Sequence, residues 1–394
     1  MASVEIEFSL ITLLNPPGLV EKILDEFEKQ SKIRVKYRKL EWATAWSDLV
    51  KFAIYKDGPD VSEVGTTWVG DMVGMEAVRP LSRTDVFSIG GANAFLPSAW
   101  NSCMTADQRI WAVPWLSDTR VLYYRRDLLE KAGVDPVKAF QTHESLKTTL
   151  QRLQDGGIEY PWVIPTHRTR MTLHNVAAWV WGAGGDFISA DGVHVTFQHP
   201  KALEGFRQYF ELAKFIAPGA HELDDTQSDA MFWQGKSAVT ISGPWLLRTP
   251  GIKPEVLGNI GVTFPPGIPW FGGSNLVIWQ YSTHIRESLA FIRFITSKQV
   301  RETFMSDATM LPVRRDVLDS PSFADPRFEY LRKGLQTGRA FYLIHNWGMV
   351  EDRLSSVLSN IWTQIVQTPD LDLPALLEQE LSNLARRLEL AMGG

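Results

Sequence analysis

An alternation of strand and helix at the start of the chain limits the folds open to it more than any other feature. Residues 4–11 read as a first strand, and residues 32–40 alternate in hydrophobicity like a second. Between them, apolar residues recur at helical spacing, namely Leu19, Val20, Ile23, Leu24 and Phe27. Because a helix that joins two such strands makes a right-handed crossover, the pattern predicts an α/β fold with a mainly parallel sheet flanked by helices.

The same pattern restarts after an extended segment at residues 110–114. A strand is predicted at residues 121–124 and a helix at 127–132. Further helices are expected at about 143–154, 172–182, 201–216 and 226–234. The chain has 394 residues, enough for two ordinary domains, and it contains no obvious linker or repeat. We therefore expect two α/β lobes joined by extended crossovers.

Residues 232–245 form the most informative single segment. Gly235 can adopt the left-handed conformation that ends a helix. Residues 238–241 suit a short parallel strand covered on both faces, and Gly243 and Pro244 end it. Trp245 is then expected to be exposed just beyond the carboxyl end of the strand. Ligands bind at that end of the strands in open α/β sheets.

Composition and missing motifs exclude several classes of function. The net charge of −5 and the scattered basic residues argue against a nucleic-acid partner. The single cysteine, Cys103, excludes an internal disulfide, and the eight histidines show no metal-ligand spacing. No nucleophile elbow, zinc motif or phosphate-binding loop occurs, so we expect no catalysis, no metal and no cofactor. Most of the fifteen tryptophans are expected in the core or between lobes, with a subset lining a carbohydrate site.

A set of short segments occurs along the chain in the order known from one protein family. They are Gly58-Pro59-Asp60-Val61, Ala112-Val113-Pro114, Asp127-Leu128-Leu129-Glu130-Lys131-Ala132-Gly133, Gly184-Gly185-Asp186, Phe271-Gly272-Gly273-Ser274, Leu311-Pro312-Val313-Arg314 and the segment 232–245. The chain therefore resembles the extracellular solute-binding proteins of bacterial ABC importers, in the carbohydrate-binding group that includes maltose-binding protein. The resemblance covers nearly the whole chain.

This resemblance implies a two-lobed, periplasmic-binding-protein-like (type II) fold with the ligand between the lobes and closure by hinge motion. It implies three hinge crossovers, near residues 112–114, 275–279 and 311–313. The implied lobes are residues 1–112 with 279–311, and residues 113–278 with 312–394. The implied partners are a carbohydrate and the transmembrane subunits of an ABC permease. The protein is expected to act as a monomer in the periplasm or at the cell surface. The start of the chain lacks the basic and apolar regions of an export signal, so this location implies that the signal has been removed. A cytoplasmic protein is the alternative.

Matching the family pattern assigns ligand contacts to three residues of the second lobe. Trp245 matches the stacking aromatic, and Trp347 matches a second aromatic ahead of a C-terminal helix. Asp118 matches a carboxylate that accepts hydrogen bonds from sugar hydroxyls. The alternatives are structural roles for the tryptophans and a salt bridge from Asp118 to Arg120 or Arg125.

Five further residues are candidates on weaker grounds. Asn275 follows two glycines where backbone can approach a ligand closely, and Arg314 follows the third crossover. Glu41, Trp42 and Trp68 lie near the ends of strands of the first lobe. Arg314 could instead form an ion pair between the lobes, and Trp68 could be buried by a helix.

The loop around His167 and Arg168 leaves the charge of the ligand open. It is more cationic than in many relatives, so it favours an anionic sugar or phosphate ester if it faces the ligand, and it is otherwise a solvated loop. A polyamine, an organophosphate or iron are alternative ligands within the same fold. A two-lobed glycoside hydrolase is the alternative from another class, and it would need two carboxylates about 5–9.5 Å apart.

Overall fold

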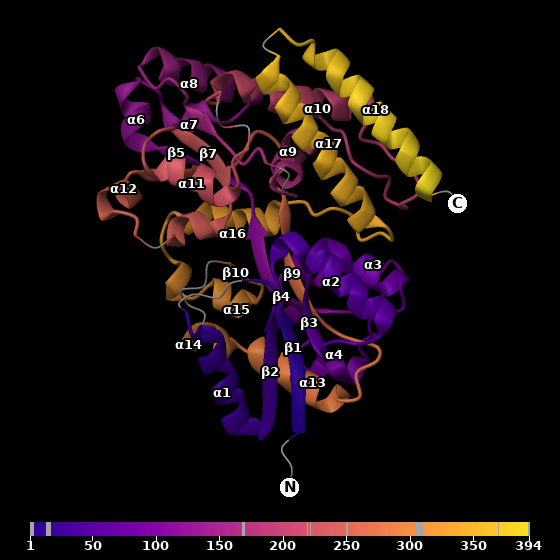
Figure 1. The fold of residues 1–394 in the computed structure, drawn as a ribbon. Coiled ribbons are helices and arrows are strands. Elements are labelled where there is room, and N and C mark those ends of the chain that lie inside the picture. Colours follow the sequence, from indigo (N-terminus) through magenta and orange to yellow (C-terminus); the bar gives the residue numbers. More distant parts are fainter. Residues whose placement is uncertain are drawn as a thin grey trace. The chain divides into compact units, whose positions relative to one another are not determined.

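The computed structural model describes residues 4–12, 17–167, 170–218, 220, 222–249, 251–304, 310–368 and 370–392. The chain forms two compact units, drawn in Figure 1. Unit 1 consists of Met1–Asp118, Gly272–Phe328 and Leu343–Gly348. Unit 2 consists of Thr119–Phe271, Glu329–Tyr342 and Met349–Gly394. Each unit has its own β-sheet and its own buried core, as an α/β fold requires.

Unit 1 is built on a six-stranded sheet with the strand order β10-β4-β9-β3-β1-β2. Its strands are β1 (Val4–Leu10), β2 (Ile33–Lys39), β3 (Val61–Gly65), β4 (Val113–Thr119), β9 (Phe271–Ile278) and β10 (Leu311–Pro312). The strand β1 pairs in parallel with β2 and β3, as the opening alternation predicts. The late strand β9 pairs antiparallel with β3, and β10 pairs antiparallel with β4. The sheet is therefore mixed.

Two groups of helices bury the apolar residues of this sheet. The helices and helical turns of unit 1 are α1 (Leu19–Ser31), α2 (Trp42–Tyr55), η1 (Thr66–Trp68), α3 (Val69–Gly74), α4 (Arg83–Ser88), η2 (Ala92–Ala94), α5 (Pro97–Asn101), α13 (Ile285–Ile295), α14 (Lys298–Phe304), α15 (Arg315–Leu318) and η5 (Pro321–Phe323). Phe27 of α1 packs edge-on against Phe291 of α13. Phe52 of α2 packs in the same way against Trp279, in a second buried group that includes Trp68.

Unit 2 is built on a four-stranded sheet with the strand order β6-β7-β5-β8. Its strands are β5 (Val121–Arg125), β6 (Trp162–Val163), β7 (Val239–Ser242) and β8 (Ile260–Thr263). The strand β7 pairs in parallel with β6 but antiparallel with β5. Both sheets are therefore mixed, and in unit 2 antiparallel pairs outnumber the parallel one where a mainly parallel sheet was expected. In unit 1 the late strands β9 and β10 make the antiparallel pairs, whereas in unit 2 the first strand, β5, is antiparallel to both β7 and β8. Hydrophobic periodicity along one strand carries no information on the direction of its neighbour.

The helices of unit 2 include the predicted ones, with bounds within a few residues. They are α6 (Arg126–Lys131), α7 (Pro136–Ala139), α8 (His143–Asp155), α9 (Arg170–Gly182), α10 (Pro200–Phe210), η3 (Glu211–Phe215), α11 (Asp225–Trp233), η4 (Pro244–Arg248), α12 (Pro254–Gly258), α16 (Phe328–Thr337), α17 (Trp347–Gln367) and α18 (Leu373–Met392). The helix α10 packs against α9 and α18 (Figure 1). The leucine stripe of α18 is buried. In the part of the chain that is described, no helix combines the length and apolarity needed to cross a bilayer.

The compact units do not share the bounds of the predicted lobes. Unit 1 extends to Asp118 rather than residue 112, because β4 belongs to its sheet. The unit also takes in Gly272–Phe328 and the short piece Leu343–Gly348. Along the sequence, the chain therefore passes from one unit to the other at five places rather than three. The division into lobes at the predicted residues stays a prediction.

Candidate functional site

Trp245 lies in unit 2, directly after the carboxyl end of β7. The helix α11 ends two residues before Gly235, whose φ of 71° confirms the predicted left-handed turn. The strand β7 follows, and the helical turn η4 then begins at Pro244. Trp245 is half-buried, not exposed as predicted. The position of the indole was thus predictable from the sequence, but its environment was not.

Three contacts determine how the Trp245 indole lies. Its Nε1–H donates a hydrogen bond to Oδ2 of Asp229, at 3.0 Å. The guanidinium carbon of Arg120 lies 4.6 Å from the centroid of the ring. The ring also lies so close to Gly243 that a Cβ atom there would be 2.1–2.5 Å from three ring carbons. These contacts hold the indole in one orientation, as a site that recognises a planar ligand face requires.

Arg120 connects Trp245 to a second group of rings. Its guanidinium carbon is also 5.3 Å from the ring centroid of Trp270. His174, on α9, stacks on Trp270 with the ring centroids 3.9 Å apart and the planes 9° apart. The Nε2 atom of His174 in turn lies 3.2 Å from Oε1 of Glu351, on α17. We refer to Arg120, His174, Asp229, Trp245, Trp270 and Glu351 as the unit 2 cluster.

Buried charge distinguishes the unit 2 cluster from an ordinary aromatic core. Arg120 is 2% exposed, Asp229 6% and Glu351 1%. Burial raises the pKa of the Asp229 carboxyl to about 7, against the opposing effect of hydrogen bonds from Ser242 and Trp245. Burial also raises the pKa of the neighbouring Asp225, which Arg120 partly offsets. Perturbed carboxyls beside an aromatic surface are typical of a functional site.

A second aromatic group lies in unit 1. Trp42 is 40% exposed, whereas Trp68 is 1% exposed. The ring of Trp68 has its centroid 5.7 Å from that of Trp42 and 5.6 Å from that of Trp46. Trp42 is therefore the one ring of the three with a large exposed area, and Trp68 supports it from within the core.

Comparisons with known proteins identify the family. Residues 22–329 match the family described as bacterial extracellular solute-binding protein. The chain belongs to this family. It is 22% identical over 352 residues to the diacetylchitobiose binding protein DasA of Streptomyces coelicolor, covering 86% of this chain and 80% of DasA.

Solved structures show the same two-lobed α/β fold. The maltose-bound MalE3 of T. maritima superposes with a TM-score of 0.82 at 22% identity, covering 97% of this chain and 100% of MalE3. UgpB of Mycobacterium tuberculosis, solved in complex with glycerophosphocholine, superposes with a TM-score of 0.80 at 18% identity, covering 99% of both chains. The predicted fold class and family are thereby confirmed.

Three other residues predicted to bind the ligand of this solute-binding protein lie in unit 1. Each makes polar or ionic contacts with neighbouring side chains. The Asn275 amide is 1% exposed and donates to the carbonyl and hydroxyl oxygens of Ser102, at 3.2 and 3.1 Å. Arg314 makes two hydrogen bonds with Asp316, at 3.0 and 2.9 Å. Glu41 is exposed and pairs with Lys39 at 2.7 Å. These contacts give each residue a structural role, and their roles as ligand contacts stay predictions.

The remaining predicted residues differ in accessibility. Asp118 is buried in β4, and Arg125, one of its two proposed partners, pairs with Asp127 instead. Trp347 is 1% exposed at the start of α17, where the adjacent Gly348 N–H donates to Asp71. His167 is exposed. Arg168 lies outside the described residues.

Sequence reasoning missed four members of the unit 2 cluster as site residues: His174, Asp229, Trp270 and Glu351. Arg120 entered only as a possible partner of Asp118. These residues come from separate elements, and none belongs to a motif of fixed spacing. The one available signal was the position of Asp229 one helical turn before the end of α11, just ahead of the segment that contains Trp245.

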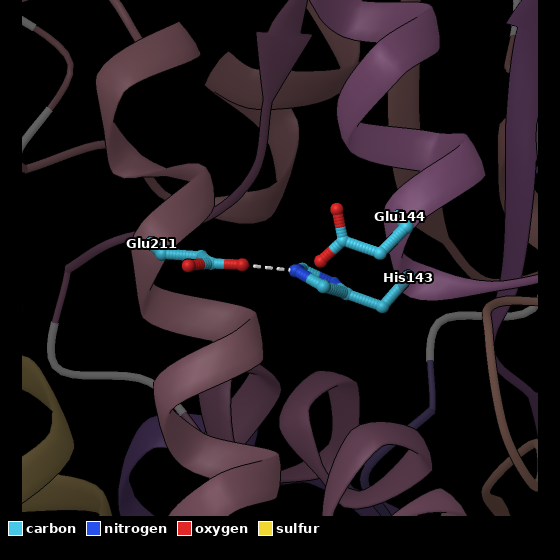
Figure 2. Close-up of side chains that lie close together, drawn as sticks. All are labelled: His143, Glu144 and Glu211. Carbon is cyan, nitrogen blue, oxygen red and sulfur yellow. Dashed lines mark hydrogen bonds and ion pairs between the residues drawn. The ribbon is translucent and has the colours of Figure 1, made fainter.

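A separate cluster of His143, Glu144 and Glu211 has the residue types of a metal site (Figure 2). One potential ligand atom from each lies within 4.8 Å of the others, an arrangement that the spacing of the histidines did not indicate. The Trp179 indole N–H donates to Nδ1 of His143, and because an indole can only donate, Nε2–H is the group that faces Glu211. Glu211 also pairs with Lys147 and Arg207, at 3.3 and 2.9 Å. Both ring nitrogens of His143 and both Glu211 oxygens are thus engaged, which fits a structural connection between α8 and η3.

Proposed function

We propose that this solute-binding protein captures a carbohydrate outside the cytoplasm and delivers it to the transmembrane subunits of an ABC permease. The observation that carries the proposal is Trp245, held half-exposed by Asp229, Arg120 and Gly243. A sugar ring has an apolar face of C–H groups and a rim of hydroxyls. A fixed indole suits the face, and neighbouring charged groups suit the hydroxyls.

The exposed ring of Trp42 is a second candidate surface, on unit 1, for stacking against a sugar ring. Trp68 holds it from behind, as a rigid support for a surface aromatic should. We propose Trp245, Trp42 and His167, whose side chains are at least partly exposed, as the ligand contacts of highest priority. Asp118 and Asn275 rank lower because they are buried, and Arg314 and Glu41 rank lower because they pair with Asp316 and Lys39.

The names of relatives support a sugar as the ligand. DasA is named for diacetylchitobiose, and MalE3 was solved with maltose. UgpB was solved with glycerophosphocholine, a phosphodiester, which makes a phosphate ester the second ligand class to test. We further propose that the protein acts as a monomer in the periplasm or at the cell surface. It releases its ligand without changing it chemically.

A thermal-shift screen tests the proposed function. The panel is maltose, N,N′-diacetylchitobiose, glucuronate and glycerophosphocholine, each also recovered and checked for cleavage. A ligand present at about 100 times its dissociation constant should add about 2.7 kcal/mol to the free energy of unfolding. Stabilisation by a neutral sugar that is recovered intact supports the proposal. Stabilisation by glycerophosphocholine alone would favour the phosphate-ester alternative, and cleavage of a sugar would indicate an enzyme.

A further inference from the structure

The Asp229 carboxylate lies at the N–H edge of the Trp245 indole and faces charged or titratable groups from several elements. One of its oxygens, Oδ2, accepts both the Trp245 N–H, at 3.0 Å, and the Ser242 hydroxyl, at 3.3 Å. Asp225 lies one turn earlier on the same helix, and its charge raises the pKa of Asp229. Arg120 acts in the opposite direction. Asp229 is therefore the acceptor on which the polar edge of the indole depends.

Two further titratable groups lie around this carboxyl. The Tyr123 hydroxyl, on β5, donates to the Gly243 carbonyl at 2.7 Å, and burial together with the charge of Asp229 raises the pKa of that phenol. His174, on α9, acts on Asp225 through its charge. The phenol is neutral throughout the physiological range, because its pKa lies above the ordinary value for tyrosine. Asp229 is thus the group of the cluster that titrates near neutral pH, and Asp225, Arg120 and His174 are the charged or titratable groups around it.

Loss of the Asp229 charge weakens two of the three contacts that hold Trp245. A hydrogen bond to a carboxylate is roughly twice as strong as one to a neutral carboxyl. The attraction between Asp229 and Arg120 also depends on the charge, and Arg120 covers the Trp245 ring. The third contact, the close approach to Gly243, is steric and does not titrate.

We propose that Asp229 is a positioning residue for Trp245, and that its ionised form holds the indole in the orientation that binds the solute, so that solute binding weakens on acidification. This inference rests on the proposed role of Trp245 in ligand binding. Its first consequence, a proton-dependent orientation of the indole, is measurable without any ligand.

The expected pH dependence of binding is opposite in sign to that of stability. Because the pKa of Asp229 is raised in the folded protein, its contribution to stability is present at low pH and is lost as the pH rises through about 7. Binding should instead strengthen over the same range. A purely structural carboxyl would affect stability alone, so the two profiles together separate a positioning role from a structural one.

The test follows the indole N–H resonance of Trp245 by NMR from about pH 5.5 to about pH 8.5, assigned with a Trp245→Phe variant. In the wild type the resonance should shift with a midpoint near 7. In Asp229→Asn, which keeps an oxygen acceptor of the same shape, that shift should vanish. In the matched control Asp225→Asn the shift should remain, with a lower midpoint, because a negative neighbour has been removed. A resonance that does not titrate in the wild type, or that titrates equally in Asp229→Asn, would overturn the inference.

Calorimetry with maltose and diacetylchitobiose extends the test to binding. The dissociation constant of the wild type should rise about tenfold from about pH 8.5 to about pH 5.5, while that of Asp229→Asn should stay constant. A wild-type affinity that does not change with pH would also overturn the inference. If neither sugar binds, the proposed ligand class fails, and the indole titration alone decides whether Asp229 positions Trp245.

Discussion

At the scale of single residues, the orientation of Trp245 depends on what lies beneath its ring as much as on its partners. Gly243 has an extended backbone with φ of −95°, so no left-handed conformation requires a glycine there. The requirement is steric, because ring carbons of Trp245 occupy the place of a Cβ atom. An orientation fixed before binding reduces the entropy that binding would otherwise cost.

The variant Gly243→Ala should therefore displace the indole. We expect at least a tenfold loss of sugar affinity, equivalent to about 1.4 kcal/mol, with the fold retained as judged by circular dichroism. The matched control is Gly258→Ala, also in unit 2, where a Cβ atom would meet nothing within 4 Å. Equal affinities for the two variants in calorimetry would show that the tight contact between Gly243 and Trp245 does not matter for binding.

How far the sequence predicts this site differs between Trp245 and its neighbours. The end of α11, the short strand and the tryptophan beyond it follow from local turn and strand preferences, and all three were predicted in the right order. Arg120, His174, Trp270 and Glu351 reach the cluster from distant parts of the chain. Spacing within one element gives no information about such contacts, so these residues emerged only from the structure.

At the scale of elements, polar contacts around the partly buried Glu211 carboxylate connect helices whose bounds were predictable. Helical spacing of apolar residues predicted α8 and α10, but not that His143 of α8 faces Glu211 of η3 (Figure 2). Burial opposes ionisation of Glu211, yet its hydrogen bond with His143 and the charges of Lys147 and Arg207 lower its pKa below the ordinary value. This carboxylate therefore stabilises the folded state when it is charged.

Replacing Glu211 by Gln should destabilise unit 2 by about 1–3 kcal/mol at neutral pH, because it weakens bonds to three partners. A lowered folded-state pKa contributes stability that is present above the unfolded value, about 4.3, and is lost as the pH falls through the folded value. The difference between wild type and variant should accordingly shrink below about pH 4. Urea unfolding at several pH values measures it, and a constant difference would contradict the assigned role.

At the scale of the whole molecule, each unit is an α/β body with its own core and its own aromatic group. The order of weak segments along the chain predicted the family and the fold, although each segment alone carried little information. The mixed direction of the strands and the bounds of the compact units were not predicted, because pairing between distant strands leaves no local pattern.

The central claim is that Trp245 carries the recognition of a sugar. Its matched control is Trp111 of unit 1, another half-buried indole, which donates its N–H to Thr105 at 2.8 Å and has the guanidinium of Arg109 5.4 Å from its ring centroid. Both substitutions thus remove an indole with one hydrogen bond and one cation–π contact. Only Trp245→Ala removes the indole that we propose contacts the sugar.

Calorimetric titration of the stabilising sugar from the screen into the wild type, Trp245→Ala and Trp111→Ala tests this claim most directly. Trp245→Ala should lose about 2 kcal/mol or more of binding free energy, roughly a thirtyfold rise in the dissociation constant. Trp111→Ala should bind like the wild type. Unchanged affinity in Trp245→Ala, or an equal loss in both variants, would contradict the account.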